Sequence, residues 1–122
     1  MNIVLLVEHH ILFRQALAHV IERETDVEVI AQAGSVAEGG RHLDTLDGDI
    51  DVAIVDIDLR DSGVTDLIRE MRETEPDLPV LVLTNSQDPA RHAQALEVGA
   101  AEVLTKAATV EEILAAVRRQ AR

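Results

Sequence analysis

Short apolar runs alternate with segments of helical periodicity along the chain. Four of the runs are nearly continuous Val, Ile, Leu and Ala, which is typical of strands covered on both faces of a parallel sheet. The second run alternates apolar and less apolar residues, which indicates an edge strand with one wetter face. The five predicted strands are Ile3–Val7, Val27–Ala33, Val52–Ile57, Val80–Thr84 and Glu102–Thr105.

Helical spacing of apolar residues fills the segments between these strands. Ser35-x-x-Glu38 and Thr109-x-x-Glu112 are capping boxes that mark two helix starts. Gly99 is placed to end the helix that precedes the last strand. The clearest helical sets are Leu12, Ala16, Leu17, Val20 and Ile21, then Val64, Leu67, Ile68 and Met71, and finally Val110, Ile113, Leu114 and Val117.

A strand followed by a helix thus occurs five times, and we expect one domain over residues 1–122. Such alternation predicts an α/β fold with a parallel sheet and helices on both faces. For five units the common arrangement is the doubly wound, flavodoxin-like order 2-1-3-4-5 with five helices. In that order the first and third strands are neighbours, and a crevice opens at their carboxyl ends. We expect the functional site there.

Composition narrows the classes of function. The chain has 11 basic and 23 acidic residues, a net charge of −12, no Cys, and 1% aromatic residues. Disulfides, thiolate metal sites and base-stacking surfaces are therefore excluded. Because so negative a surface repels phosphate backbones and anionic lipid, we expect no direct binding of nucleic acid or membrane. The first apolar run is too short for a signal peptide, which favours a cytoplasmic location.

Polar side chains follow or end the predicted core strands. Asp56 interrupts an apolar strand, where a lone carboxylate is costly unless it is paired or bound to a metal ion. Two carboxylates about 4 Å apart repel by about 4 kcal/mol at an effective dielectric of 20, so Asp56 and Glu8 together need a cation or a proton. Lys106 is the only lysine in the chain and lies where that charge is needed. The polar set is Glu8, His9, Asp56, Asp58, Thr84 and Lys106.

Phosphoryl transfer to a carboxylate is the chemistry that uses such a set. An aspartate oxygen attacks phosphorus, and the reaction depends mainly on positioning and charge neutralisation. A divalent cation, a lysine and a hydroxyl would each bind one phosphoryl oxygen. Other acidic residues have a plainer interpretation: Asp44, Asp47 and Asp49 suit a solvated turn. Arg118, Arg119 and Arg122 suit the dipole of the last helix.

Four segments in order resemble the receiver domain of response regulators, of the kind found in NarL/FixJ (LuxR-type) transcription regulators. These segments are Val7–Leu17, Asp51–Leu59, Val80–Thr84 and Gly99–Lys106. The resemblance implies that Asp56 is the phosphoacceptor, Thr84 the switch hydroxyl and Lys106 the phosphate-pairing lysine. It also implies metal ligation by Glu8 and Asp56 and by the backbone carbonyl of Asp58.

Three residues depart from the pattern of that family, one of which is Ala107, which follows Lys106 where many receivers have Pro. His9 takes the place of the second metal-ligating acid, and Val103 takes the place of the usual switch aromatic. Mg²⁺ prefers oxygen ligands, whereas imidazole suits transition metals, so we expect Mg²⁺ affinity to be reduced or lost. The longer Glu8 side chain and the Asp58 carboxylate are the two groups that can compensate.

The leading hypothesis is therefore a receiver that takes a phosphoryl group from a sensor histidine kinase. It would control a DNA-binding helix-turn-helix domain beyond residue 122, with homodimerisation as a further expectation. A degenerate receiver that acts only in dimerisation or docking is an alternative suggested by His9 and Val103. A haloacid-dehalogenase-like phosphatase is another, because Asp56-Ile57-Asp58 mimics its Asp-x-Asp motif.

Overall fold

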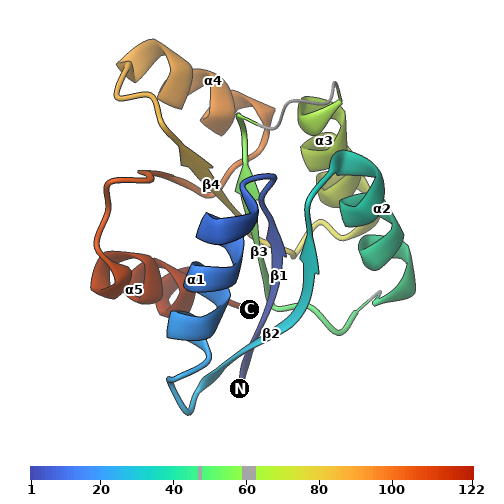
Figure 1. The fold of residues 1–122 in the computed structure, drawn as a ribbon. Coiled ribbons are helices and arrows are strands. Elements are labelled where there is room, and N and C mark those ends of the chain that lie inside the picture. Colours follow the sequence, from blue (N-terminus) through green and yellow to red (C-terminus); the bar gives the residue numbers. More distant parts are fainter. Residues whose placement is uncertain (47, 59–62) are drawn as a thin grey trace.

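Strands and helices alternate strictly in the computed structural model (Figure 1), which describes residues 1–46, 48–58 and 63–122. The strands are β1 (Asn2–Val7), β2 (Val27–Ala33), β3 (Val52–Asp56), β4 (Val80–Thr84) and β5 (Glu102–Thr105). The helices are α1 (Ile11–Ile21), α2 (Val36–Thr45), α3 (Val64–Thr74), α4 (Pro89–Val98) and α5 (Val110–Gln120). The predicted strands agree with the observed ones to within one residue at each end.

The sheet is parallel and has the predicted order β2-β1-β3-β4-β5. Val7 of β1 is paired with Val55 of β3, so the residues that follow these two strands emerge side by side. Thr84 of β4 is paired with Thr105 of β5 in the same way. This register brings the carboxyl ends of four strands to one edge of the sheet, as the doubly wound order predicts.

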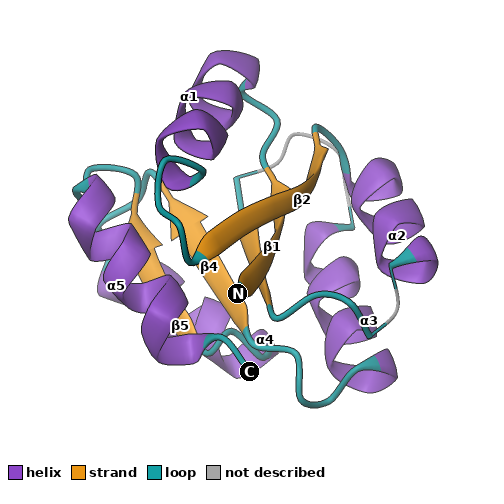
Figure 2. Ribbon diagram, turned by 90° about the horizontal axis from the view of Figure 1, so that it is seen from below, coloured by secondary structure: helices purple, strands orange, loops and turns teal. Residues whose placement is uncertain are grey.

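Helices cover both faces of the sheet, and each face has its own apolar core (Figure 2). On one face, Leu17 of α1 and Val117 of α5 belong to the same buried cluster. On the other face, Leu43 of α2, Met71 of α3 and Ala95 of α4 form the second cluster. The helical spacing of apolar residues therefore predicts the packing correctly, because the buried apolar residues of the helices face the sheet.

Burial along the strands follows their place in the sheet. Every residue of β3 and β4 is buried, whereas β2 alternates between buried and exposed residues, as expected for an edge. The expectation that the last strand is covered on both faces is wrong: all four residues of β5 are only half-buried, because β5 forms the other edge. Leu12, assigned to the apolar face of the first helix, is 71% exposed.

The helix ends confirm most of the capping signals. Thr109 accepts a hydrogen bond from the Glu112 amide, and the Glu112 carboxylate accepts one in return, which completes a capping box. Ser35 accepts from the Glu38 amide, but the structure gives no reciprocal hydrogen bond from Ser35 to the Glu38 carboxylate, so that predicted capping box is only half formed. Gly99 ends α4 with a φ of 131°, a conformation that favours glycine.

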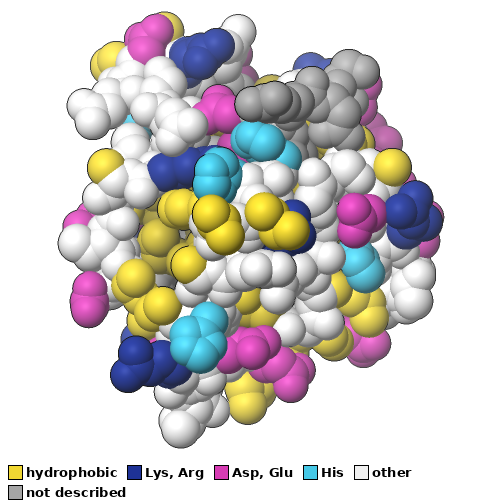
Figure 3. All heavy atoms as spheres, in the orientation of Figure 1, with side chains coloured by type: hydrophobic (Ala, Val, Ile, Leu, Met, Phe, Trp, Pro, Cys, Tyr) yellow, Lys and Arg dark blue, Asp and Glu magenta, His cyan; other side chains and the backbone are white. Residues whose placement is uncertain are grey.

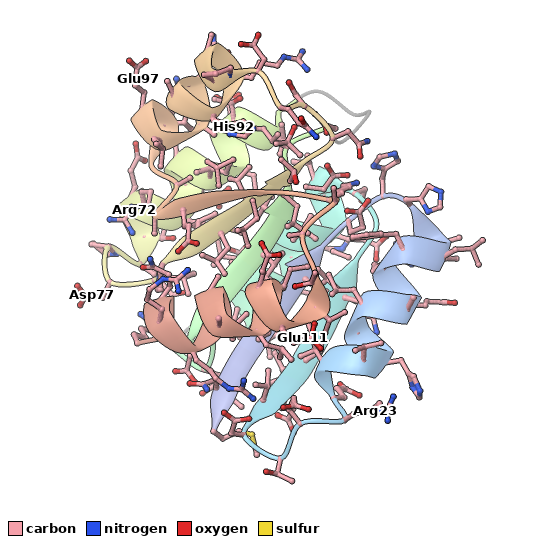
Figure 4. The ribbon with its side chains drawn as sticks, turned by 90° about the vertical axis from the view of Figure 1, so that its left-hand side faces the viewer. Arg23, Arg72, Asp77, His92, Glu97 and Glu111 are labelled. Atoms are coloured by element: carbon pink, nitrogen blue, oxygen red, sulfur yellow. The ribbon has the colours of Figure 1, made fainter. Side chains whose placement is uncertain are left out.

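Surface charges pair with one another rather than gather in one basic patch. Arg118 binds Asp26 and Glu24, and Arg119 binds Glu102, so these arginines have specific partners beyond the helix dipole. Asp77 and Glu97 point away from the sheet (Figure 4).

Of the three aspartates assigned to a solvated turn, one lies elsewhere, one lies in the turn and one is outside the described residues. Asp44 is exposed but lies in α2, while Asp49 lies in the turn as predicted. Asp47 is outside the described residues. None of the described helices is long and apolar enough to cross a membrane.

Candidate functional site

Charged side chains meet at the carboxyl end of the sheet because β1, β3 and β5 all end there. Glu8 directly follows β1, Asp56 is the last residue of β3, and Lys106 directly follows β5. The Glu8 and Asp56 side chains are fully buried, and the Lys106 side chain is 11% exposed. The strands thus carry two carboxylates and one ammonium group to the same buried place.

Lys106 bridges the two carboxylates. Its Nζ lies 2.9 Å from each oxygen of Glu8 and 3.2 Å from Oδ2 of Asp56. Hydrogen-bond geometry holds for Oε1 of Glu8, whereas Oε2 is buried without a hydrogen bond. Nζ also lies 5.2 Å from the centre of the Phe13 ring, within the range of a cation–π interaction. The predicted pairing of Asp56 with the only lysine is confirmed by these distances.

His9 binds the same aspartate. Its Nδ1 lies 2.7 Å from Oδ2 of Asp56 and 3.7 Å from Oε1 of Glu8. Nδ1 carries the proton and donates it to the carboxylate, since an unprotonated nitrogen would repel the charged oxygen at that distance. The other Asp56 oxygen accepts a 2.8 Å hydrogen bond from the backbone amide of Asp58. His9 thus fixes the orientation of the Asp56 carboxylate.

The backbone around Glu8 is held on several sides. Its amide donates to the carbonyl of Ala33 at 2.9 Å, and its carbonyl accepts from Arg14 at 2.9 Å. Its carboxylate also accepts from the amide of His10 at 3.1 Å. His10 in turn caps α1, because its Nδ1 accepts from the Phe13 amide. The sequence signalled none of these contacts of His10, which stands in a position that Ser, Thr, Asp or Asn usually fill.

The two buried carboxyls differ in pKa because their environments differ. Burial raises the pKa of Glu8, and the hydrogen bond from Lys106 offsets only part of that effect. Burial alone would raise the pKa of Asp56 as well. Hydrogen bonds with the Glu8 carboxyl, the Asp58 amide and His9 outweigh this effect and lower the pKa of Asp56. For Lys106 burial acts against the charged form, yet the two carboxylates prevail and raise its pKa. The surroundings therefore favour the charged form more strongly at Asp56 than at Glu8.

Thr84 and Asp58 form a second polar contact beside the buried cluster. The Thr84 hydroxyl donates to Oδ2 of Asp58 at 3.2 Å, and the Asn85 amide donates to the same oxygen at 2.7 Å. Thr84 is thus at the expected edge of the sheet, but its hydroxyl is directed to Asp58. Sequence reasoning assigned the backbone carbonyl of Asp58 to a metal ion and its carboxylate to a compensating role there, and missed this contact with Thr84.

An open cavity of about 500 Å³ lies next to Thr84. It is bounded by α3, α4 and the ends of β4 and β5, and Val103 forms part of its wall. Where the family pattern places a large aromatic residue, this chain has a small aliphatic one, which fills less of the space. On the outer surface, Figure 3 shows histidine side chains beside a basic side chain above α1.

The comparisons with known proteins agree with the fold. Residues 4–118 match the response regulator receiver domain. The chain belongs to this family. The receiver is 30% identical over 115 residues to the DNA-binding transcriptional activator DevR/DosR of Mycobacterium tuberculosis, covering 94% of this chain and 52% of that one. It is 31% identical over 115 residues to the transcriptional regulatory protein UhpA of Salmonella typhimurium, covering 93% and 56%.

Solved structures give the same result. A receiver domain protein from Clostridium thermocellum is 26% identical with a TM-score of 0.88, covering 98% of this chain and 94% of that one. The receiver domain of the putative response regulator NarL from Mycobacterium tuberculosis is 28% identical with a TM-score of 0.84, covering 97% and 94%. The predicted resemblance to NarL/LuxR-type receivers is confirmed. The phosphatase and degenerate-receiver alternatives are not favoured.

Receiver domains generally bind Mg²⁺ at acidic residues. Here the possible ligands are Glu8, His9 and Asp56, whose donor atoms all lie within 4.8 Å of one another. The spacing suits a metal ion, but the donor set does not match Mg²⁺, which requires oxygen ligands. Weak Mg²⁺ binding stays a prediction, and the direct contact of His9 with Asp56 is the observation that favours it.

Proposed function

We propose that this receiver accepts a phosphoryl group on Asp56 from a sensor histidine kinase. The observation that carries the proposal is a fully buried carboxylate in direct contact with the only lysine of the chain. An Asp56 oxygen would attack phosphorus and form an acyl phosphate. The bond from phosphorus to the donor histidine nitrogen would break, and that nitrogen would keep the electron pair and take up a proton.

Lys106 and Thr84 would stabilise the phosphorylated state. Nζ of Lys106, already 3.2 Å from Asp56, is placed to pair with a phosphoryl oxygen as a point charge. The Thr84 hydroxyl would have to leave Asp58 in order to donate to another phosphoryl oxygen. Phosphorylation would thereby break the Thr84–Asp58 contact and change the surface between β4 and α4, which gives the domain two distinct states.

His9 would control access to the phosphoacceptor. Asp56 is fully buried, and one of its oxygens is hydrogen-bonded to the partly exposed imidazole. A phosphoryl donor can reach that oxygen only after the imidazole moves away. No step of the reaction is assigned to Mg²⁺, because the donor set does not match that ion.

The output of the receiver would be transcriptional. The chain spans about half the length of the curated relatives that it matches, and those relatives are transcription regulators. We therefore place a DNA-binding helix-turn-helix domain after residue 122 of the whole protein, and a sensor kinase beside it in the cytoplasm. Homodimerisation stays a prediction, which sedimentation of the domain with and without phosphodonor would measure.

Intact mass spectrometry after incubation with acetyl phosphate tests the proposal. Parallel reactions with MgCl₂, MnCl₂ and ZnCl₂ remove the dependence on one choice of metal. We expect one phosphoryl adduct on the wild type and on the exposed control Asp66→Asn, and none on Asp56→Asn. An unmodified wild type in all three reactions would contradict the proposal, as would an adduct that survives in Asp56→Asn.

A further inference from the structure

Three side chains at the carboxyl end of the sheet bear on which metal ion the site prefers. Glu8, His9 and Asp56 contribute two carboxylates and one imidazole to a pocket in which both carboxylates are fully buried. One of the four carboxylate oxygens, Oε2 of Glu8, is buried without a hydrogen bond. The Lys106 ammonium lies 2.9 Å from this oxygen, so a metal ion that binds it must displace that ammonium.

The distances fit tetrahedral coordination. Bonds of about 2.0–2.1 Å from Zn²⁺ to nitrogen and oxygen place neighbouring ligand atoms about 3.3 Å apart. Nδ1 of His9 lies 2.7 Å from Asp56 Oδ2 and 3.7 Å from Glu8 Oε1, values on either side of that separation. A small adjustment of these two contacts, together with displacement of the Lys106 ammonium, would convert the cluster into a three-ligand site with an open fourth position.

The charge of the cluster also disfavours a hard ion. Glu8 and Asp56 are offset in part by Lys106, so the cluster holds two carboxylates, one ammonium and an imidazole. A hard ion such as Mg²⁺ depends on anionic oxygen ligands and keeps most of its water. A borderline transition-metal ion binds imidazole nitrogen more strongly, and its affinity rises along the series from Mn²⁺ to Cu²⁺, with Zn²⁺ below Cu²⁺.

We propose that Glu8, His9 and Asp56 form a site for a divalent first-row transition-metal ion, with Zn²⁺ or Co²⁺ bound in preference to Mg²⁺. This inference names the ion that the proposed phosphoacceptor site takes and rests on that proposal for its role. The ion would replace the proton on Nδ1 of His9, and the ammonium of Lys106 would shift from Glu8 toward Asp58 or solvent. Removal of the Lys106 charge is therefore expected to strengthen metal binding.

Calorimetric titration of metal-free protein with ZnCl₂, CoCl₂ and MgCl₂ tests the proposal, and visible absorption of bound Co²⁺ reports its geometry. The wild type should bind one Zn²⁺ or Co²⁺ per chain at least about tenfold more tightly than Mg²⁺. His9→Asp should narrow the preference by strengthening Mg²⁺ binding, and His9→Gln should weaken Zn²⁺ binding by about tenfold or more. Lys106→Gln should tighten Zn²⁺ binding. His19→Asn, at an exposed histidine of α1, is the control and should bind as the wild type does.

Equal affinity of the wild type for Zn²⁺ and Mg²⁺ would overturn the inference. So would Zn²⁺ binding that survives both His9 variants or is lost in His19→Asn, since the ion would then occupy surface histidines. The phosphorylation assay is separate from these titrations. A phosphoryl adduct on Asp56 without selective Zn²⁺ binding refutes only the metal inference, and selective binding without an adduct refutes only the proposed function.

Discussion

Buried carboxylates occur at both ends of the sheet, and the two ends balance their charge differently. At the amino end, Glu75 is 6% exposed and accepts hydrogen bonds from Arg122 at 2.8 Å and from the Gly48 amide at 3.1 Å. One carboxylate there meets one guanidinium. At the carboxyl end, Glu8 and Asp56 share the single ammonium of Lys106.

This difference separates a structural ion pair from a reactive site. The Glu75–Arg122 pair also joins two parts of the chain, since Arg122 donates to the carbonyl of Ile50 at 2.9 Å. One carboxylate is matched by one guanidinium there, although Oε2 of Glu75 is buried without a hydrogen bond. The carboxyl end retains a surplus negative charge, which a proton, a metal ion or a rearrangement on phosphorylation can relieve. Surplus charge at functional sites costs stability in many proteins.

The largest expected effect is that of Lys106→Met. Without the ammonium, two buried carboxylates face each other with only His9 between them, and breaking such an arrangement costs about 3 kcal/mol or more in the free energy of unfolding. Urea unfolding near neutral pH measures the loss. Arg69→Met, on an exposed side chain of α3, is the matched control and should stay within about 0.5 kcal/mol of the wild type. A loss no larger than the control's would show that Lys106 does not balance the cluster.

Glu8→Gln should act in the opposite direction. Because burial raises the pKa of Glu8, the folded state disfavours its charge, and the amide keeps the volume and one hydrogen-bond acceptor. We expect a gain of about 1 kcal/mol in unfolding free energy near neutral pH. A raised pKa means that this gain shrinks as the pH falls through the folded-state pKa, where Glu8 is itself protonated. Urea unfolding near neutral pH and below the folded-state pKa of Glu8 measures this gain, with the exposed Glu97→Gln as control. A loss of stability in Glu8→Gln near neutral pH would contradict the prediction.

Glu75→Gln at the other end should destabilise the domain. The amide keeps one acceptor oxygen but loses the charge that holds Arg122, so we expect a loss of about 1 kcal/mol. Thermal unfolding measures it, and a double variant with Arg122→Gln should show a smaller loss than the two single losses added together. Glu8→Gln should thus raise the free energy of unfolding and Glu75→Gln should lower it, and this opposition tests the comparison of the two ends most sharply. Equal signs would remove the distinction between the two ends.

The smallest effect concerns Glu102 at the sheet edge. Burial alone would raise its pKa, but hydrogen bonds from Arg119 and Gln120 outweigh this and hold the pKa below the usual 4.5. A lowered pKa gives stability that is present above pH 4.5 and lost as the pH falls through the folded-state value. Glu102→Gln should thus cost a few tenths of a kcal/mol near neutral pH and nothing in strong acid. A cost independent of pH would assign the loss to packing rather than to charge.

The sequence specified the fold well because its signals were local and repeated. Apolar runs located the strands, and the strand order followed from five strand–helix units. Asp56 and Lys106 were also predictable, since a lone acid in an apolar strand and a single lysine at another strand end need each other. The half-burial of β5 was not predictable from its residues, because a strand's place at the edge depends on the whole sheet.

The contacts of His9, His10 and Asp58 could not be predicted from the chain. They depend on side-chain directions after the strands end, where no periodicity acts. His9 turns toward Asp56 because β1 and β3 are neighbours in register, and Asp58 reaches Thr84 because β3 and β4 are. Adjacent residues such as His9 and His10 thus have different roles, one on the phosphoacceptor and one on the start of α1.

Localisation of the phosphoryl group tests the central claim most directly. Borohydride reduces the acyl phosphate of an aspartate to homoserine, and peptide mapping by mass spectrometry then identifies the modified position. After treatment with acetyl phosphate and a divalent metal ion, we predict homoserine at position 56 and unchanged aspartate at positions 51, 58 and 66. Homoserine at any of those three positions with unmodified Asp56 would contradict the account.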